Sequence, residues 1–307
     1  MRTALTADMW TSDEHLEEAL EEYNLKVSEL ETCGTHEELL EALVNRSTVL
    51  IMMESFTSAM TDLEDCIELS ELMEERGERV DTGTFIKIRE NRGQLFFGED
   101  DEAMVSDYSM IASRLDDVHQ GIRHYDRKGL VQMCIDCAED LLDQGYDQNS
   151  VPFIEKGLEL IGGNFDRWSS NRRIELSNLM GQASDGMGLT DRAYAAFTDS
   201  INIGAPLFKR YGLEDDMALV LAFICRGDIN DIRCNREDHI ADHESAADIM
   251  EQLYEERRLG DVELLVNLHR GLASAYSGIG DTSASERHLI RALRLSVPSM
   301  GLNERGQ

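Results

Sequence analysis

One spacing pattern recurs along this chain and constrains its fold more than any single residue does. A residue at a predicted turn is followed, after five, four and three residues, by residues of small, large and small size in the clearest copies. The clearest copies are Gly188, Ala193, Phe197 and Ser200; Gly280, Ser285, Leu289 and Ala292; and Gly145, Ser150, Ile154 and Gly157. Looser copies are Glu54, Ala59, Leu63 and Cys66; Gly98, Ala103, Asp107 and Met110; and Cys234, His239, His243 and Ala246.

The six turn positions are almost evenly spaced. They lie at residues 54, 98, 145, 188, 234 and 280, which are 44, 47, 43, 46 and 46 residues apart. A period of this length is typical of units that cannot bury an apolar face alone and must stack on their neighbours. The pattern therefore predicts an all-α protein of about six helical hairpins in one extended domain.

Two segments carry a resemblance to a known repeat family. They are GLASAYSGIGDTSASERHLIRALRL at 271–295 and NLMGQASDGMGLTDRAYAAFTDSINI at 178–203, and both resemble the tetratricopeptide repeat. In that family a small residue on the first helix, here Gly181, lets the second helix cross closely, and a residue such as Gly188 closes the turn. The resemblance implies a right-handed superhelical solenoid. The usual repeat has about 34 residues, so these repeats of about 45 residues are similar to the long-helix variants.

The repeat pattern divides the chain into three parts. Residues 35–298 form the predicted array, residues 299–307 a C-terminal tail, and residues 1–34 an N-terminal region with a capping helix. The capping helix has a narrow apolar seam made of Leu16, Leu20, Tyr23, Val27 and Leu30. Such a helix covers the exposed end of a solenoid, and the alternative use of this seam is dimerisation.

The charge of the chain excludes several classes of partner. There are 61 Asp and Glu residues against 29 Lys and Arg residues, which gives a formal net charge of −32. Binding to phosphates needs a basic footprint, so nucleic acid and anionic membranes are not expected partners. No apolar stretch is long enough for a membrane span, and the N-terminus lacks the apolar core of a signal peptide. We expect a cytoplasmic protein.

The resemblance implies that the first helix of each hairpin lines a concave face. The polar residues at the inward places of three central first helices are Glu139, Asp143, Glu175, Asn178, Gln182, Asp185, Asp228 and Asp231. Repeat proteins that grip acidic C-terminal peptides use Lys, Arg and Asn there, and that pattern is missing. An acidic groove favours a basic protein or peptide partner, and the alternative is a solvated face that only keeps the chain soluble.

Two pairs of residues are candidates for metal or redox chemistry. Cys134 and Cys137 form a Cys-x-x-Cys, but the repeat register places both in the core, so we expect reduced, buried thiols. His239 and His243 are four residues apart, which puts both imidazoles on one helical face. We predict that they are partly buried and hydrogen-bonded, with no retained metal. The alternative is a metal site, for which the further ligands cannot be assigned. No cofactor is expected.

No motif in the chain indicates catalysis. There is no phosphate-binding glycine loop after a strand and no Gly-x-Ser-x-Gly motif. The sequence therefore favours a non-enzymatic scaffold that binds a peptide or helix of another protein. The alternative is a sensor of a small signal, either a peptide or a metal, and an enzyme is the less favoured class. The identity of the partner, the pathway and the oligomeric state stay open.

Overall fold

The computed structural model describes residues 13–118, 122–163 and 166–296. Within these ranges the regular elements are thirteen α-helices and a short 3-10 turn at Leu115–Asp117, without any strand. The predicted tail at 299–307 lies outside the described residues. No helix in the described part of the chain is both long and apolar enough to cross a membrane. The predicted all-α class is confirmed.

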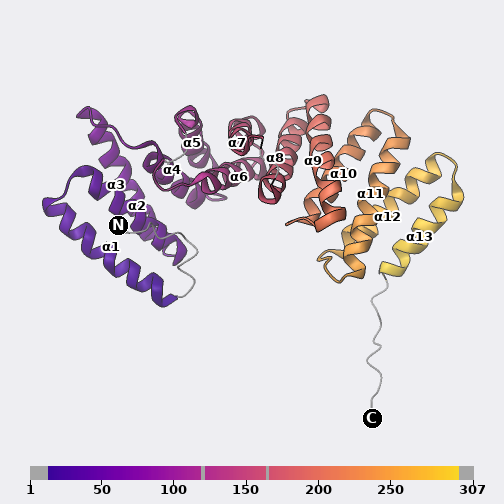
Figure 1. Ribbon diagram of the computed structural model, residues 1–307, viewed down its shortest axis with the longest axis horizontal. Coiled ribbons are helices and arrows are strands. Elements are labelled where there is room, and N and C mark those ends of the chain that lie inside the picture. Colours follow the sequence, from indigo (N-terminus) through magenta and orange to yellow (C-terminus); the bar gives the residue numbers. More distant parts are fainter. Residues whose placement is uncertain (1–12, 119–121, 164–165, 297–307) are drawn as a thin grey trace, which may run out of the picture. The chain divides into compact units, whose positions relative to one another are not determined.

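The helices form six hairpins after one N-terminal helix, α1 (Asp13–Cys33). The hairpins are α2 (His36–Met52) with α3 (Phe56–Glu75), α4 (Thr82–Phe96) with α5 (Asp101–Ala112), α6 (Arg127–Asp143) with α7 (Asp147–Ile161), α8 (Arg167–Gly186) with α9 (Thr190–Tyr211), α10 (Asp216–Ile232) with α11 (Arg236–Glu255), and α12 (Val262–Gly278) with α13 (Thr282–Ser296). Their number and order agree with the repeat pattern (Figure 1).

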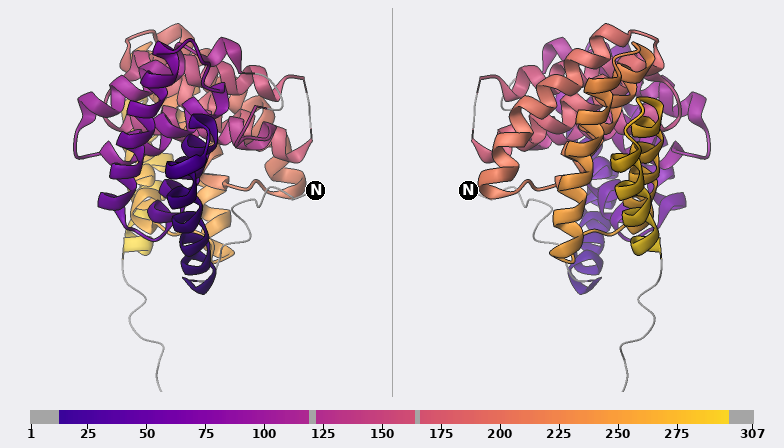
Figure 2. Two further views of the ribbon diagram at one scale, coloured as in Figure 1. Left: turned by 90° about the vertical axis from the view of Figure 1, so that its left-hand side faces the viewer. Right: turned by 90° about the vertical axis from the view of Figure 1, so that its right-hand side faces the viewer.

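The chain divides into two units, residues 1–160 and residues 161–307. The first unit holds α1 and the first three hairpins, and α7 reaches one residue past the boundary. The second unit holds the last three hairpins, in which each second helix packs on its own first helix, and α9 and α11 also pack on the next first helix. Figure 2 shows α12 and α13 of this unit side by side.

All six predicted turn positions have a left-handed backbone. The φ angles are 57° at Glu54, 72° at Gly98, 78° at Gly145, 71° at Gly188, 58° at Cys234 and 83° at Gly280. In the fourth hairpin the amide of Leu189 donates a hydrogen bond to the carbonyl of Ser184, five residues earlier, at 2.7 Å. The same bond closes the first, third, fifth and sixth hairpins, and it is the usual way to satisfy the last carbonyls of a helix.

The small residues predicted at the helix crossings are buried where the two helices meet. A Cβ added to Gly181 would lie 2.5 Å from the ring of Phe197, so α8 and α9 approach too closely for any side chain there. Ala193 and Ser200, on either side of Phe197, are fully buried. The equivalent place, seven residues before each turn, is also small and buried in four other hairpins, at Ser47, Ala138, Gly227 and Ala273.

The second hairpin departs from the predicted spacing by one residue. Its second helix begins three residues after the turn at Gly98, whereas the others begin two residues after theirs. The buried residues of α5 are therefore Met104, Asp107, Tyr108 and Ile111, and Met110, the last place of the pattern in this hairpin, is 39% exposed. Ala103 is only partly buried. The repeat pattern therefore does not mark the buried face of α5 correctly at Ala103 and Met110, because the turn before this helix is one residue longer.

The predicted seam of α1 packs on the first hairpin. Leu16, Ala19 and Val49 form a buried cluster, with Leu20 and Tyr23 packed against it. Val49 belongs to α2, so the apolar residues of α1 are used within the chain as a cap. The last helix has no such cover among the described residues, and Leu289, at the large place of the repeat pattern, is 52% exposed.

Candidate functional site

The predicted groove residues occupy repeated places on successive first helices. Glu139, Gln182 and Asp228 lie six residues before their turns, and Asp185 and Asp231 lie three residues before theirs. Gln182 is partly buried, and the four acidic side chains are exposed. Because the places are equivalent, they mark the same face of each first helix. We call Asp185, Asp228 and Asp231, on α8 and α10 of the second unit, the acidic row.

The charges of two members of the acidic row, on different helices, act on one thiol. Cys225 of α10 is partly buried, and its pKa is raised to about 11 by burial first and then by the charges of Asp228 and Asp185. Asp185 belongs to α8 and Asp228 to α10, and these two helices pack on each other. The two exposed carboxylates therefore lie on neighbouring first helices of the second unit.

Two members of the acidic row lack a neutralising partner in the described part of the chain. No cationic side chain described there forms an ion pair with Asp185 or Asp231. Their exposure gives a ligand direct access to both carboxylates. The acidic row thus retains negative charge that a cationic group could neutralise.

Two other predicted groove residues have structural contacts. Asn178 is only 4% exposed, and its amide donates a 2.7 Å hydrogen bond to the carbonyl of Ala218, which joins α8 to α10. Glu175 is partly buried and forms a 2.6 Å ion pair with Arg172. A buried side-chain amide that donates to a backbone carbonyl of the neighbouring helix stabilises the packing of the two helices. We therefore assign Asn178 a structural role between α8 and α10.

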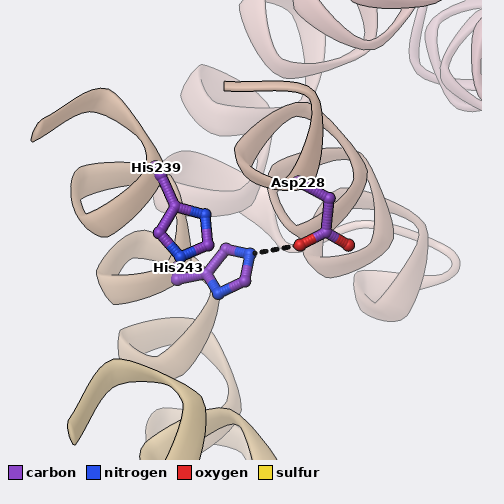
Figure 3. A group of neighbouring side chains, drawn as sticks. All are labelled: Asp228, His239 and His243. Atoms are coloured by element: carbon purple, nitrogen blue, oxygen red, sulfur yellow. Dashed lines mark hydrogen bonds and ion pairs between the residues drawn. The ribbon is translucent and has the colours of Figure 1, made fainter. Parts of the chain in front are cut away.

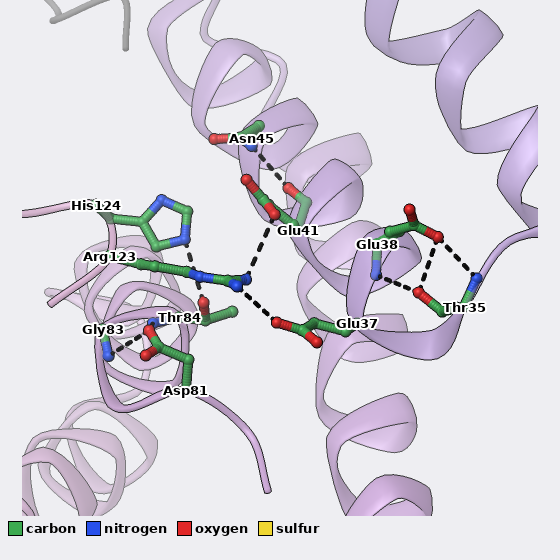
Figure 4. A network of polar contacts seen from close by, with 10 residues as sticks. All are labelled: Thr35, Glu37, Glu38, Glu41, Asn45, Asp81, Gly83, Thr84, Arg123 and His124. Atoms are coloured by element: carbon green, nitrogen blue, oxygen red, sulfur yellow. Dashed lines mark hydrogen bonds and ion pairs between the residues drawn. The ribbon is translucent and has the colours of Figure 1, made fainter. Parts of the chain in front are cut away.

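The first unit presents acidic residues in a different way. Glu139 and Asp143 are exposed on α6. Arg123, which precedes α6, forms ion pairs with two residues of α2, Glu37 at 2.6 Å and Glu41 at 3.5 Å (Figure 4). The acidic residues of α2 are therefore partly neutralised by their own chain.

The backbone around Arg123 is held against the start of α4. A Cβ on Gly83 would lie 2.1 Å from the carbonyl oxygen of Arg123, so only glycine permits this approach. Beside it, the hydroxyl of Thr84 lies 3.3 Å from Nε2 of His124, and Asp81 caps the helix (Figure 4). These contacts fix the segment that carries the guanidinium.

The two histidines of α11 point toward α10 (Figure 3). Nδ1 of His239 lies 2.9 Å from the carbonyl oxygen of Gly227, and Nε2 of His243 lies 3.1 Å from Oδ1 of Asp228. His239 is partly buried and His243 is buried. The predicted hydrogen bonding of both histidines within the helix pair is present. Asp228 is the residue that their spacing could not reveal.

The Cys-x-x-Cys pair lies in the core, as predicted. Cys134 and Cys137 are fully buried and free. Burial raises the pKa of Cys134 to about 12 and the pKa of Cys137 well above its ordinary value. Thiolates are the reactive form of cysteine, so both thiols act here as small apolar residues.

The ion pairs of three buried aspartates were not anticipated from the sequence. Asp62 and Asp242 lie eight residues after their turns, and each accepts hydrogen bonds from an arginine eight residues before the turn, Arg46 or Arg226. Asp107 is fully buried and accepts hydrogen bonds from two arginines of α4. The sequence does contain a signal for two of them, because in both hairpins an Arg lies eight residues before the turn and an Asp lies eight residues after it. These ion pairs join the two helices of their hairpins.

Comparisons with known proteins give structural similarity without close sequence similarity. No protein-family model matches the chain, and no curated protein matches its sequence. Among solved structures, the apo form of RapI has a TM-score of 0.61 at 11% identity and covers 93% of this chain and 77% of its own.

Two further structures support the same fold. The C-terminal part of a TPR repeat-containing protein from Cytophaga hutchinsonii has a TM-score of 0.58 at 14% identity, with 95% of each chain covered. Aspartyl phosphate phosphatase F from Bacillus subtilis has a TM-score of 0.53 at 11% identity, covering 96% of this chain and 76% of that chain. Together with the six hairpins and their left-handed turns, these similarities identify the fold as that of a tetratricopeptide-like helical-repeat protein.

Proposed function

We propose that this chain is a non-enzymatic binding protein that holds a basic segment of another protein on the acidic row of its second unit. The observation that carries the proposal is that Asp185 and Asp228 are exposed on α8 and α10, two first helices that pack on each other. Two exposed carboxylates on neighbouring helices form a surface that a cationic side chain can approach from solvent. Repeat proteins use such extended faces for recognition.

Electrostatics gives this face its selectivity. Asp185 and Asp231 have no cationic partner among the described residues. An incoming Lys or Arg side chain therefore does not have to displace an ion pair of either aspartate. The net charge of −32 repels acidic segments from the whole chain. Complementary charge mainly raises the rate of encounter and discriminates against wrong partners. A segment with several Lys or Arg residues is therefore the expected ligand.

The test compares two charge-matched variants. Asp185→Asn/Asp231→Asn removes two charges from the acidic row, whereas Asp199→Asn/Glu286→Gln removes two exposed charges from the second helices α9 and α13. The probe is a pool of short labelled peptides in which every third residue is Lys or Arg. We expect the first variant to bind this pool about threefold or more slowly at ~20 mM salt, and the difference to fade at ~500 mM salt because ions screen the attraction.

The control variant should bind the basic pool almost as fast as the unaltered protein. A matched pool with Asp and Glu in the same places should not bind to any of the three proteins. Equal slowing by both variants would mean that total charge, and not the acidic row, attracts the peptides. That result, or no binding of the basic pool, would refute the proposal.

A further inference from the structure

One donor atom each from Asp228, His239 and His243 lies within 4.8 Å of the other two. The carboxylate comes from α10 and both imidazoles come from α11, so the cluster spans the two helices of the fifth hairpin (Figure 3). The ring centroids of the histidines are 4.2 Å apart and the rings are tilted by 48°. Two imidazoles and one carboxylate are a ligand set that zinc accepts.

The hydrogen bond of His239 determines which of its nitrogens is free. Nδ1 lies 2.9 Å from the carbonyl oxygen of Gly227, and a carbonyl can only accept. Nδ1 therefore carries the proton, and the lone pair of the neutral ring is on Nε2. Metal-binding histidines usually hold their second nitrogen in this way, by donating its proton to a carbonyl or carboxylate. His239 is thus held in the form that binds a metal.

Hydrogen bonding within the core does not account for His243. Its side chain is only 10% exposed, and Nδ1 has no hydrogen-bond partner among the described residues. Its polar contact is the one from Nε2 to Asp228, whose side chain is 61% exposed. In the fourth hairpin the equivalent place is taken by Phe197, which packs without any polar requirement. The polar partner of this buried ring is thus an exposed carboxylate, which can bind a metal ion together with the ring.

The backbone of α10 makes room for this ring. A Cβ on Gly227 would lie 2.5 Å from Cδ2 and 2.9 Å from Nε2 of His243. Because the glycine lacks a side chain, the imidazole lies directly against α10 and beside Asp228. The 3.1 Å between His243 Nε2 and Asp228 Oδ1 is close to the ~3.3 Å between two ligand atoms on a tetrahedral zinc with bonds of ~2.0 Å. Zinc bound there would replace the proton that Nε2 donates to the carboxylate.

We propose that Asp228, His239 and His243 bind one zinc ion, with the fourth ligand position open to solvent or to a donor from a partner. The exposed Asp228 side chain can rotate to complete the geometry, while the two histidines stay on the packed helix. Zinc would connect α10 to α11 in a hairpin whose turn residue, Cys234, has a positive φ of 58° without being glycine. It would also neutralise one carboxylate of the acidic row.

The test is a titration of the full chain with zinc alone, after removal of metal by a chelator and under reducing conditions. The background is Cys33→Ser/Cys234→Ser, because these two exposed thiols are alternative zinc ligands. We expect one zinc per chain by isothermal titration calorimetry, with a rise in the melting temperature as zinc is added. Absence of saturable zinc binding in this background would overturn the proposal.

Matched variants locate the site. His239→Ala and, separately, Asp228→Asn should each weaken zinc binding by about tenfold or more, since even residues that only orient metal ligands contribute about 10- to 100-fold. Asp228 is exposed, so its variant should keep the fold even if a histidine variant does not. His36→Ala, in the first hairpin, is the control and should leave the affinity unchanged. Zinc binding that survives both His239→Ala and Asp228→Asn would contradict the assignment.

Discussion

Replacing Asp107 by alanine should lower the free energy of unfolding by about 3–5 kcal/mol, the range for breaking a buried ion pair from one side. Asp107 is fully buried and accepts 2.7 Å hydrogen bonds from Arg89 and Arg92. Both guanidinium groups are largely buried, with 11% and 20% of their side chains exposed. Without the carboxylate, two cations remain in the interior with no counter-charge. Urea unfolding followed by circular dichroism measures the loss.

The control for Asp107 is an exposed ion pair in the same unit. Glu74 pairs with Arg114 at 3.0 Å, and its side chain is 52% exposed. Solvent screens such pairs, so Glu74→Ala should cost about 1 kcal/mol or less. Hydrogen exchange should place the effect of Asp107→Ala in α4 and α5. Equal destabilisation by the two variants would show that the buried network does not hold this hairpin together.

Gly181→Leu should destabilise the second unit by about 3 kcal/mol, at the upper end for overfilling a packed interior. Even the Cβ of a new side chain would lie 2.5 Å from Phe197, which is far inside the contact distance of two carbons. The helices α8 and α9 must then separate, although leucine is the better helix former. Thermal unfolding of the purified variant measures the cost.

A second glycine provides the matched control. Gly271 lies within α12, and a Cβ there would meet nothing within 4 Å. Gly271→Leu should therefore leave stability unchanged or raise it by up to about 1 kcal/mol, because the helix gains propensity without a clash. Adding Phe197→Ala to Gly181→Leu should recover part of the loss. Similar losses from both glycine variants would contradict the close crossing of α8 and α9.

The repeat pattern predicted the hairpins well because it records requirements of the backbone. A left-handed residue is needed at every turn, and the pattern located all six, including Glu54 and Cys234, which are not glycine. The resemblance to the tetratricopeptide repeat located Gly181, because the family keeps a small residue where the second helix crosses closely. Where the turn at Gly98 is one residue longer, the repeat pattern does not mark the buried face of α5 correctly at Met110, which is exposed.

The candidate sites were less predictable because they depend on contacts between helices. The spacing of His239 and His243 showed one face of one helix, but not that Asp228 faces it from α10. Similarly, Asn178 has the right spacing for the groove, yet its amide is buried against the carbonyl of Ala218. Helical periodicity gives the direction of a side chain from its own helix. It does not give the distance to the neighbouring helix.

Site-specific photo-crosslinking in the native host tests most directly whether the face that carries the acidic row binds a basic partner. A photoreactive amino acid replaces Gln182 on the face of the acidic row, or Asp199, which is exposed on the second helix α9, as the control. We predict that position 182 labels a discrete protein through a segment rich in Lys and Arg, and that position 199 does not. Equal labelling of that protein from both positions, or labelling of an acidic segment from position 182, would contradict the account.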